Sequence, residues 1–399
     1  MPDIITPESV GVDARRIGRI SPWMNEYVDS GRLESCLTAV MRRGKLVYLD
    51  QAGPVDPETI FRIYSMTKPI TAAAAMTFFE EARFQLDDPV SRFLPEFENI
   101  RVWNQSGSAD DTVPADSPLQ IWHLFSHTSG LIYGSRDDTV IGQAYQTNNV
   151  DFSNRNVETL AATVSRLASL PLKNQPGTRW EYGVSTDVLG RLIEVLAGKP
   201  LDQVFQERIF DPLGMTDTGF QVPEAQAGRM PDMHQLSKGE RTLAEKGGAG
   251  SSWVKPVTLF SGGGGLASTV GDYLKFCEMI RCKGVFGDVR ILGRHTVELM
   301  TLNWMPGGVD LASMGQPTFS ETSYEGVGFG LGFSIVLDPA AAKGALSVGE
   351  AAWGGAASTA FWIDPVEEVS VVFMTQLLPS SSYPIRRELR SLVYQSLID

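Results

Sequence analysis

Strand-like runs lie at both ends of this chain and helix-forming segments fill its middle, and this division constrains the fold more than any other feature. Residues 38–41 and 46–49 are apolar runs on either side of a tight turn, which predicts two paired strands. Residues 333–337, 360–363 and 369–374 are strand-like runs near the C-terminus. The economical arrangement is one sheet built from both ends of the chain, with a helical domain inserted between them.

The same division predicts the domain boundaries. We expect residues 1–85 and 270–399 to form a discontinuous α/β domain that holds the sheet, and residues 86–269 to form a mainly helical domain. A length of 399 residues is enough for two domains. We also expect a long helix from about residue 71 and a final helix over residues 385–398.

Composition excludes several classes of partner. The net charge of −13 predicts repulsion of phosphate backbones, so we expect no nucleic-acid partner. No run approaches about twenty consecutive apolar residues, so we expect no membrane span.

The N-terminal segment does not resemble a secretory signal, and we expect a cytoplasmic protein. Three scattered cysteines, and a His123–His127 pair without a third ligand, predict no metal site.

The Ser-x-x-Lys spacing occurs twice, as Ser65 with Lys68 and as Ser252 with Lys255, whereas the esterase elbow Gly-x-Ser-x-Gly is absent. Ser65 lies where an expected strand meets the long helix, and residues three apart share a helix face. The start of a helix also offers unpaired N–H groups to a developing negative charge. Ser252 lies in a glycine-rich loop, so we interpret it as a chance match.

A serine hydroxyl needs a base to become a nucleophile. Lys68 can accept a proton only if burial or a nearby cation lowers its pKa, or a tyrosinate near the lysine can share the task. Tyr133 and Tyr182 both lie in suitable loops, and spacing alone favours neither. Pro69 disfavours helical geometry at Lys68, so we expect the regular helix to begin only at about Thr71.

Six motifs in order resemble a known family. Residues 61–69 resemble the nucleophile segment of the serine beta-lactamase and penicillin-binding-protein superfamily, and more narrowly that of the family VIII carboxylesterases, which are related to class C beta-lactamases. The others are a His-Thr-Ser-Gly-Leu turn, a Pro-Gly…Tyr segment, a Pro-Leu-Gly-Met turn, a glycine-rich segment and a Trp-Gly-Gly motif, at residues 127–131, 176–182, 212–215, 261–266 and 353–355. Together they extend over nearly the whole chain.

This resemblance implies a beta-lactamase-like α+β fold, with an antiparallel sheet flanked by helices and the active site in the cleft between the two domains. It implies that Ser65 is the acylated nucleophile and that Lys68 is its partner base. It implies that Tyr182 is the second general base and acid, because Tyr182 occupies the family's tyrosine position.

The Trp-Gly-Gly motif is implied to border the substrate, through Trp353, Gly354 and Gly355. The oxyanion hole would consist of the backbone N–H groups of Ser65 and Ala356, since glycines let a strand's backbone approach the substrate closely.

Two departures from beta-lactamases concern the substrate. Val184 stands where those enzymes usually have an asparagine, and Trp353 replaces the lysine of their Lys-Thr-Gly motif. The second change removes a cation that would pair with a beta-lactam carboxylate. Both changes favour a neutral, more apolar ester. Arg386 or Arg387 is a weaker candidate for supplying charge.

We therefore expect a serine carboxylesterase that hydrolyses short- to medium-chain esters through a Ser65 acyl-enzyme, with weak beta-lactam hydrolysis as a side activity. No metal or organic cofactor is needed, and the partner is a small-molecule ester. One alternative is an acyltransferase that uses the same acyl-enzyme. Another is a catalytically silent binding protein of this fold, against which the intact Ser65, Lys68 and Tyr182 argue.

Overall fold

The computed structural model describes residues 2–315 and 323–399. Its centre is a seven-stranded sheet in the order β11-β12-β13-β14-β15-β1-β2, in which every neighbouring pair is antiparallel. The strands are β1 (Cys36–Arg42), β2 (Lys45–Ala52), β11 (Val327–Phe329), β12 (Ser334–Val336), β13 (Ala351–Gly354), β14 (Ala360–Asp364) and β15 (Val369–Thr375). The sheet is thus built from both ends of the chain, which meet where β1 pairs with β15, and the predicted fold class is confirmed.

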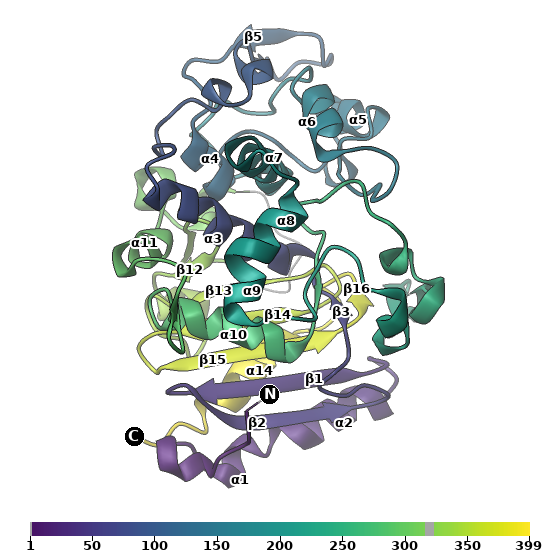
Figure 1. Ribbon diagram of the computed structural model, residues 1–399, viewed down its shortest axis with the longest axis vertical. Coiled ribbons are helices and arrows are strands. Elements are labelled where there is room, and N and C mark those ends of the chain that lie inside the picture. The colour runs from purple at the N-terminus through teal and green to yellow at the C-terminus, as the bar shows by residue number, and fades with distance from the viewer. Residues whose placement is uncertain (1, 316–322) are drawn as a thin grey trace.

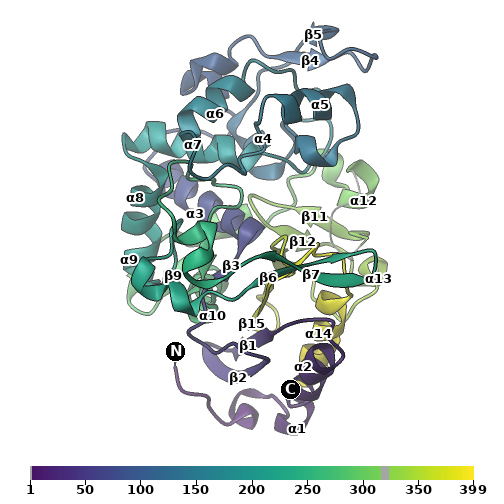
Figure 2. The same cartoon turned by 90° about the vertical axis from the view of Figure 1, so that its right-hand side faces the viewer.

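Helices cover both faces of this sheet. Helices α2 (Ile20–Asp29) and α14 (Ile385–Tyr394) lie on one side, and α10 (Val270–Arg281) lies on the other, as Figure 2 shows. Strand β15 packs against both layers, because Phe373 belongs to the core with α2 and α14 while Met374 belongs to the larger core with α3 (Thr67–Glu80). Burial on both faces explains why this strand is an almost continuous apolar run.

The middle of the chain is mainly helical and lies above the sheet in Figure 1. Its helices are α4 (Ile121–Ser126), α5 (Val140–Thr147), α6 (Leu160–Leu167), α7 (Ser185–Ala197), α8 (Leu201–Phe205) and α9 (Asp211–Leu213). Small paired strands interrupt them, namely β3 (Phe61–Arg62) with β8 (Ala267–Ser268), β4 (Arg101–Trp103) with β5 (Thr112–Pro114), and β6 (Met233–Ser237) between β7 (Glu240–Glu245) and β16 (Leu377–Leu378). The division into two domains at residues 85 and 270 stays a prediction.

The remaining α-helices and strands are short. They are α1 (Ala14–Ile17), α11 (Arg294–Met300), α12 (Leu311–Met314), α13 (Pro339–Ala342) and the pair β9 (Val285–Phe286) with β10 (Val289–Arg290). No helix within residues 2–315 and 323–399 is long and apolar enough to cross a membrane.

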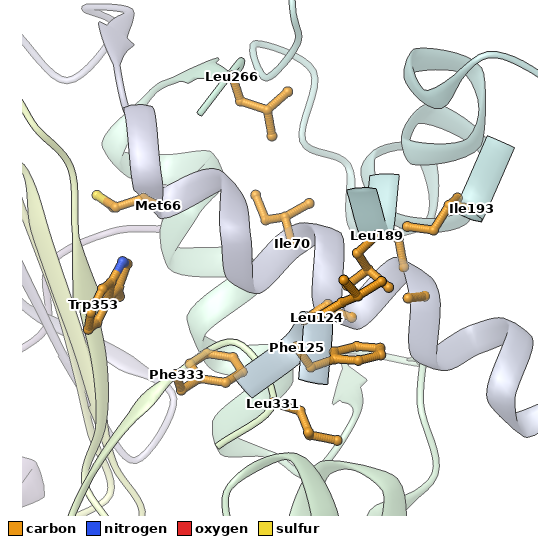
Figure 3. Close-up of a cluster of buried hydrophobic side chains, with 14 of the residues drawn as sticks. Met66, Ile70, Leu124, Phe125, Leu189, Ile193, Leu266, Leu331, Phe333 and Trp353 are labelled. Carbon is orange, nitrogen blue, oxygen red and sulfur yellow. The ribbon is translucent and has the colours of Figure 1, made fainter. Parts of the chain in front are cut away.

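Helix α3 connects the sheet to the helical layer, and its residues Thr67 to Phe78 are all buried. Figure 3 shows Ile70 of α3 close to side chains of α4 and α7, including Leu124 and Leu189. The same cluster continues to Trp353 of β13, so one core supports the start of α3 from several directions.

The start of α3 differs from the prediction. The helix begins at Thr67, so the expected start near Thr71 is wrong. Pro69 is the third residue of α3, and the first four N–H groups of a helix have no acceptor within it. The missing N–H of Pro69 therefore costs the helix no hydrogen bond. At the other end of the chain, α14 ends at Tyr394 rather than at residue 398.

Candidate active site

Ser65 lies in the single turn Tyr64–Met66 that joins β3 to α3. Tyr64 has a left-handed backbone with φ of 44°, which is uncommon for a residue other than glycine. The turn is held on both sides of Ser65, because Ile63 N donates to Leu266 O at 3.1 Å and Met66 N donates to Ile63 O at 3.0 Å. Such held local strain is typical of functional positions.

Lys68 is completely buried, and its ammonium group has three acceptors. Nζ donates to Ser65 Oγ at 3.3 Å, to Tyr133 Oη at 3.0 Å and to the Gly263 carbonyl oxygen at 2.7 Å. A protonated lysine has three donors and no acceptor. The three bonds therefore match Lys68 in its charged form.

Electrostatics also favour a charged Lys68. Burial acts to lower the pKa of Lys68, but the acidic groups Tyr133, Tyr182 and Asp187 act to raise it, and the net direction is upward. Burial raises the pKa of Tyr133 above its ordinary value although Lys68 opposes this. The site therefore does not lower the pKa of Lys68. It favours a lysine cation beside a tyrosine.

Two tyrosines flank Lys68. Its Nζ lies 4.6 Å from the ring centroid of Tyr182, and the Tyr182 hydroxyl accepts a hydrogen bond from Trp353 Nε1 at 3.1 Å. Tyr133, which does not occupy the family's tyrosine position, accepts a hydrogen bond from Lys68 itself. The two rings are 5.6 Å apart and meet edge to face. The structure therefore brings both tyrosines to the site.

The Trp-Gly-Gly motif ends β13 beside the turn that carries Ser65. A Cβ at Gly355 would overlap the Ile63 carbonyl oxygen, so only glycine lets the strand come this close. Among the residues that the structure describes, none accepts a hydrogen bond from the backbone N–H of Ser65 or of Ala356. Both residues line the same cavity, as an oxyanion hole requires.

The cavity has a volume of about 600 Å³. Ser65, Tyr133, Tyr182, Trp353 and Ala356 are among its lining residues. Further aromatic and charged side chains surround them, namely Tyr64, Phe152, Trp253 and Tyr324, with Arg136, Asp151, Arg155, Asp187, Glu245 and Arg386. A space of this size and mixed lining is typical of a small-molecule site.

The structure also places the second serine and the two histidines of the sequence motifs. Ser252 lines the cavity, and its hydroxyl donates to the Glu245 carboxylate at 2.8 Å. His123 belongs to the cap of α4, where its Nδ1 accepts from Gln120 N at 3.0 Å. His127 ends that helix, and burial together with the Lys68 charge holds its pKa well below the ordinary value.

Asp187 is a buried residue of this site that sequence reasoning missed. It lies on α7, is 1% exposed, and lines the cavity. Its Oδ1 accepts hydrogen bonds from Ser261 Oγ at 2.5 Å and from Gly263 N at 3.0 Å. No motif in the sequence marks this position.

Comparisons with known proteins bear on the family of the chain. A family model described as Beta-lactamase matches residues 20–395. Protein Rv1367c of Mycobacterium tuberculosis is 36% identical over 372 residues and covers 90% of each chain. Esterase EstB of Burkholderia gladioli is 29% identical over 416 residues and covers 98% of each chain.

A solved structure is similar over almost the same length. The structure of EstCE1, described as a hydrolase with promiscuous acyltransferase activity, has a TM-score of 0.79 and 27% sequence identity, and the match covers 96% of this chain and 99% of that one. The resemblance that the six motifs carry is thereby confirmed. The chain belongs to the Beta-lactamase family and, within it, to the group of esterases related to class C beta-lactamases.

Proposed function

We propose that this protein is a serine carboxylesterase that hydrolyses short- to medium-chain esters through an acyl-enzyme on Ser65. The observation that carries the proposal is the buried Lys68, whose Nζ is hydrogen-bonded to both Ser65 Oγ and Tyr133 Oη at the wall of the 600 Å³ cavity. The esterase name of EstB and the hydrolase description of EstCE1 support the reaction class.

In the proposed acylation, Ser65 Oγ attacks the ester carbonyl and its proton passes to Tyr182. The charge of Lys68, 4.6 Å from the Tyr182 ring, favours the tyrosinate that forms. The tetrahedral oxyanion is bound by the backbone N–H groups of Ser65 and Ala356. Tyr182 then gives this proton to the departing alkoxide as the tetrahedral intermediate collapses to the acyl-enzyme. In deacylation, Tyr182 takes a proton from the attacking water molecule and gives it to Ser65 Oγ as the acid is released.

The proposed preference for neutral esters rests on Trp353. Its indole occupies the position where beta-lactamases have a lysine. The indole is neutral, and its Nε1 donates a hydrogen bond to Tyr182, so it cannot pair with a substrate carboxylate as a lysine would. Arg386 lines the cavity and keeps some positive charge there. This charge supports weak beta-lactam hydrolysis as a side activity.

Hydrolysis of p-nitrophenyl esters of increasing acyl length tests the proposal, beside a chromogenic cephalosporin. We expect ester turnover in the wild-type protein, weak cephalosporin turnover, and loss of both in Ser65→Ala. A Ser252→Ala variant tests the second Ser-x-x-Lys match and is expected to retain ester turnover. Ester turnover that is absent from the wild type would contradict the proposal and favour the silent binding protein. Turnover that is unchanged in Ser65→Ala would contradict the role of Ser65 as the nucleophile.

Acyl transfer is the second candidate, favoured by the acyltransferase activity in the description of EstCE1. The same acyl-enzyme would pass its acyl group to an alcohol or amine instead of water. Added acceptor alcohols would then raise the rate of p-nitrophenol release and yield a new ester. Product analysis that finds only the free acid would exclude this candidate.

A further inference from the structure

Asp187 is buried beside the proposed catalytic groups and lines the same cavity as Ser65. Its Oδ1 accepts two hydrogen bonds, from Ser261 Oγ at 2.5 Å and Gly263 N at 3.0 Å. Its Oδ2 has no hydrogen-bond partner among the described residues. A buried carboxylate is costly to keep, so its presence at this position calls for a compensating role.

The two bonds at Oδ1 fix the glycine-rich turn at residues 261–265. This turn presents the Gly263 carbonyl oxygen to Lys68 Nζ at 2.7 Å, the shortest of the three lysine bonds. A Cβ at Gly263 would overlap Asp187 Oδ2, so the turn and the carboxylate fit each other only because residue 263 is glycine. The path from Asp187 to Lys68 is therefore one contiguous chain of contacts.

The same turn also holds the helix that carries Lys68. Thr71 Oγ1 donates to the Gly262 carbonyl oxygen at 2.7 Å, and Leu266 N donates to Thr67 Oγ1 at 3.1 Å. Asp187 itself lies in the first turn of α7, where the positive end of the helix dipole favours a negative charge. Asp187 thus connects the start of α7 to the start of α3 through the glycine-rich turn.

We propose that Asp187 is a positioning residue for the Ser65 reaction, which as a carboxylate fixes the turn at residues 261–265 and keeps Lys68 charged and aligned between Ser65 and Tyr133. The inference rests on the proposed esterase function. Asp187, which is not one of the three residues Ser65, Lys68 and Tyr182, then supplies the negative charge that balances Lys68.

The charge balance at Lys68 involves few other groups. Tyr133 faces Lys68 from the segment after α4, Tyr182 from the residues before α7, and Asp187 from α7 itself. His127 contacts the Tyr182 ring, and the pKa of His127 is lowered. Asp187 raises the pKa of both Lys68 and Tyr133. Burial raises the pKa of Asp187 above its ordinary value, although Lys68 and the bonds from Ser261 and Gly263 oppose this.

The effect of Asp187 on these two pKa values predicts the direction in which a pH profile should move. Asp187→Asn removes the negative charge but keeps the size of the side chain, so the Lys68 and Tyr133 pKa values both fall. An inflection in the rate that reports either group therefore moves to lower pH. The variant also loses the decline at acid pH that protonation of Asp187 contributes in the wild type.

The experiment compares pH profiles of kcat/KM for a p-nitrophenyl ester in the wild type, Asp187→Asn and Ser261→Ala, with thermal melting to verify folding. We expect kcat to fall about 10- to 100-fold in Asp187→Asn with little change in KM, since a misplaced catalytic group costs rate rather than binding. Its inflection should move to lower pH. Ser261→Ala keeps the charge, so kcat should fall less and the inflection should stay. Glu194→Gln, on the same helix but paired with Arg191, should match the wild type.

A rate loss in Asp187→Asn at every pH without a moved inflection would mean a merely structural role and would overturn the proposal, as would an unchanged rate. If Asp187→Asn does not fold, Ser261→Ala decides, and wild-type kcat in that folded variant would overturn the proposal. Labelling of Ser65 by a fluorophosphonate, followed against pH, gives the same comparison without any ester substrate. A failed esterase assay can thus be told apart from a failed role for Asp187.

Discussion

Lys68 Nζ joins three segments of the chain that are far apart in sequence. Its hydrogen bonds reach Ser65 on the same turn, Tyr133 after α4, and Gly263 in the glycine-rich turn. The Ser-x-x-Lys spacing indicated the first of these contacts, because it is local. Tyr133 and Gly263 could not be assigned from the sequence, since their approach depends on how loops of the helical layer fold against α3. Asp187 was missed for the same reason.

The two tyrosines are expected to differ in their contribution to rate. Tyr182→Phe removes the proposed general base, so kcat should fall about 10²- to 10⁴-fold. Tyr133→Phe removes only one hydrogen-bond acceptor of Lys68, so the fall should be about tenfold. Steady-state kinetics of both variants on one p-nitrophenyl ester measure this. A larger loss in Tyr133→Phe than in Tyr182→Phe would transfer the role of base to Tyr133.

At the scale of secondary-structure elements, the site depends on how the start of α3, the end of β13 and the glycine-rich turn meet. The strands β1, β2, β12, β14 and β15 were predicted nearly in place, because their apolar runs are bounded by turn residues. The start of α3 lies four residues before the predicted one, because Pro69 is in the first turn of the helix and not in its interior. Proline is unfavourable in a helix interior but tolerated in the first turn.

Gly355→Ala tests the close approach of β13 to Ser65. The added Cβ would overlap the Ile63 carbonyl oxygen and push the Ala356 N–H away from the oxyanion. We expect kcat to fall about 10²- to 10³-fold, as for loss of one oxyanion donor, with a smaller change in KM. Gly228→Ala, where nothing lies within 4 Å of the new Cβ, is the control. Equal rates in the two variants would argue against an oxyanion hole here.

Pro69→Ala tests the revised view of the start of α3. Proline at a compatible position stabilises mainly by restricting the unfolded chain. The substitution should lower the free energy of unfolding by about 0.4–1 kcal/mol and leave kcat unchanged. Urea denaturation and ester kinetics measure the two quantities. A tenfold loss of kcat with intact stability would instead show that Pro69 sets the geometry of Lys68.

At the scale of the whole molecule, one sheet with both faces covered supports the site. The prediction of a sheet built from both ends of the chain was correct because strand-like runs occur at both ends and helical segments fill the interval. The exact domain boundaries at residues 85 and 270 stay a prediction. The motifs predicted part of the lining of the 600 Å³ cavity, including Ser65, Tyr182 and Trp353. Its size and its other lining residues could not be predicted, because the cavity forms where loops from distant parts of the chain meet.

Burial of both faces predicts that neighbouring residues of β15 matter equally. Phe373→Ala and Met374→Ala each leave a cavity in a different core, so each should lower the free energy of unfolding by about 2–5 kcal/mol. Val366→Ala, with the valine 65% exposed in the turn before β15, should change it little. Urea denaturation followed by circular dichroism measures all three. A negligible effect of one core variant would mean that its face of the sheet is open.

The most direct test of the central claim is to identify the residue that becomes covalently modified. The protein is treated with a fluorophosphonate, digested and mapped by mass spectrometry, while ester hydrolysis is followed in parallel. The account predicts one adduct per chain, on the peptide that contains Ser65, with loss of activity in proportion to labelling and no labelling in Ser65→Ala. An adduct on Ser252 instead, or full ester turnover by the protein labelled at Ser65, would contradict it.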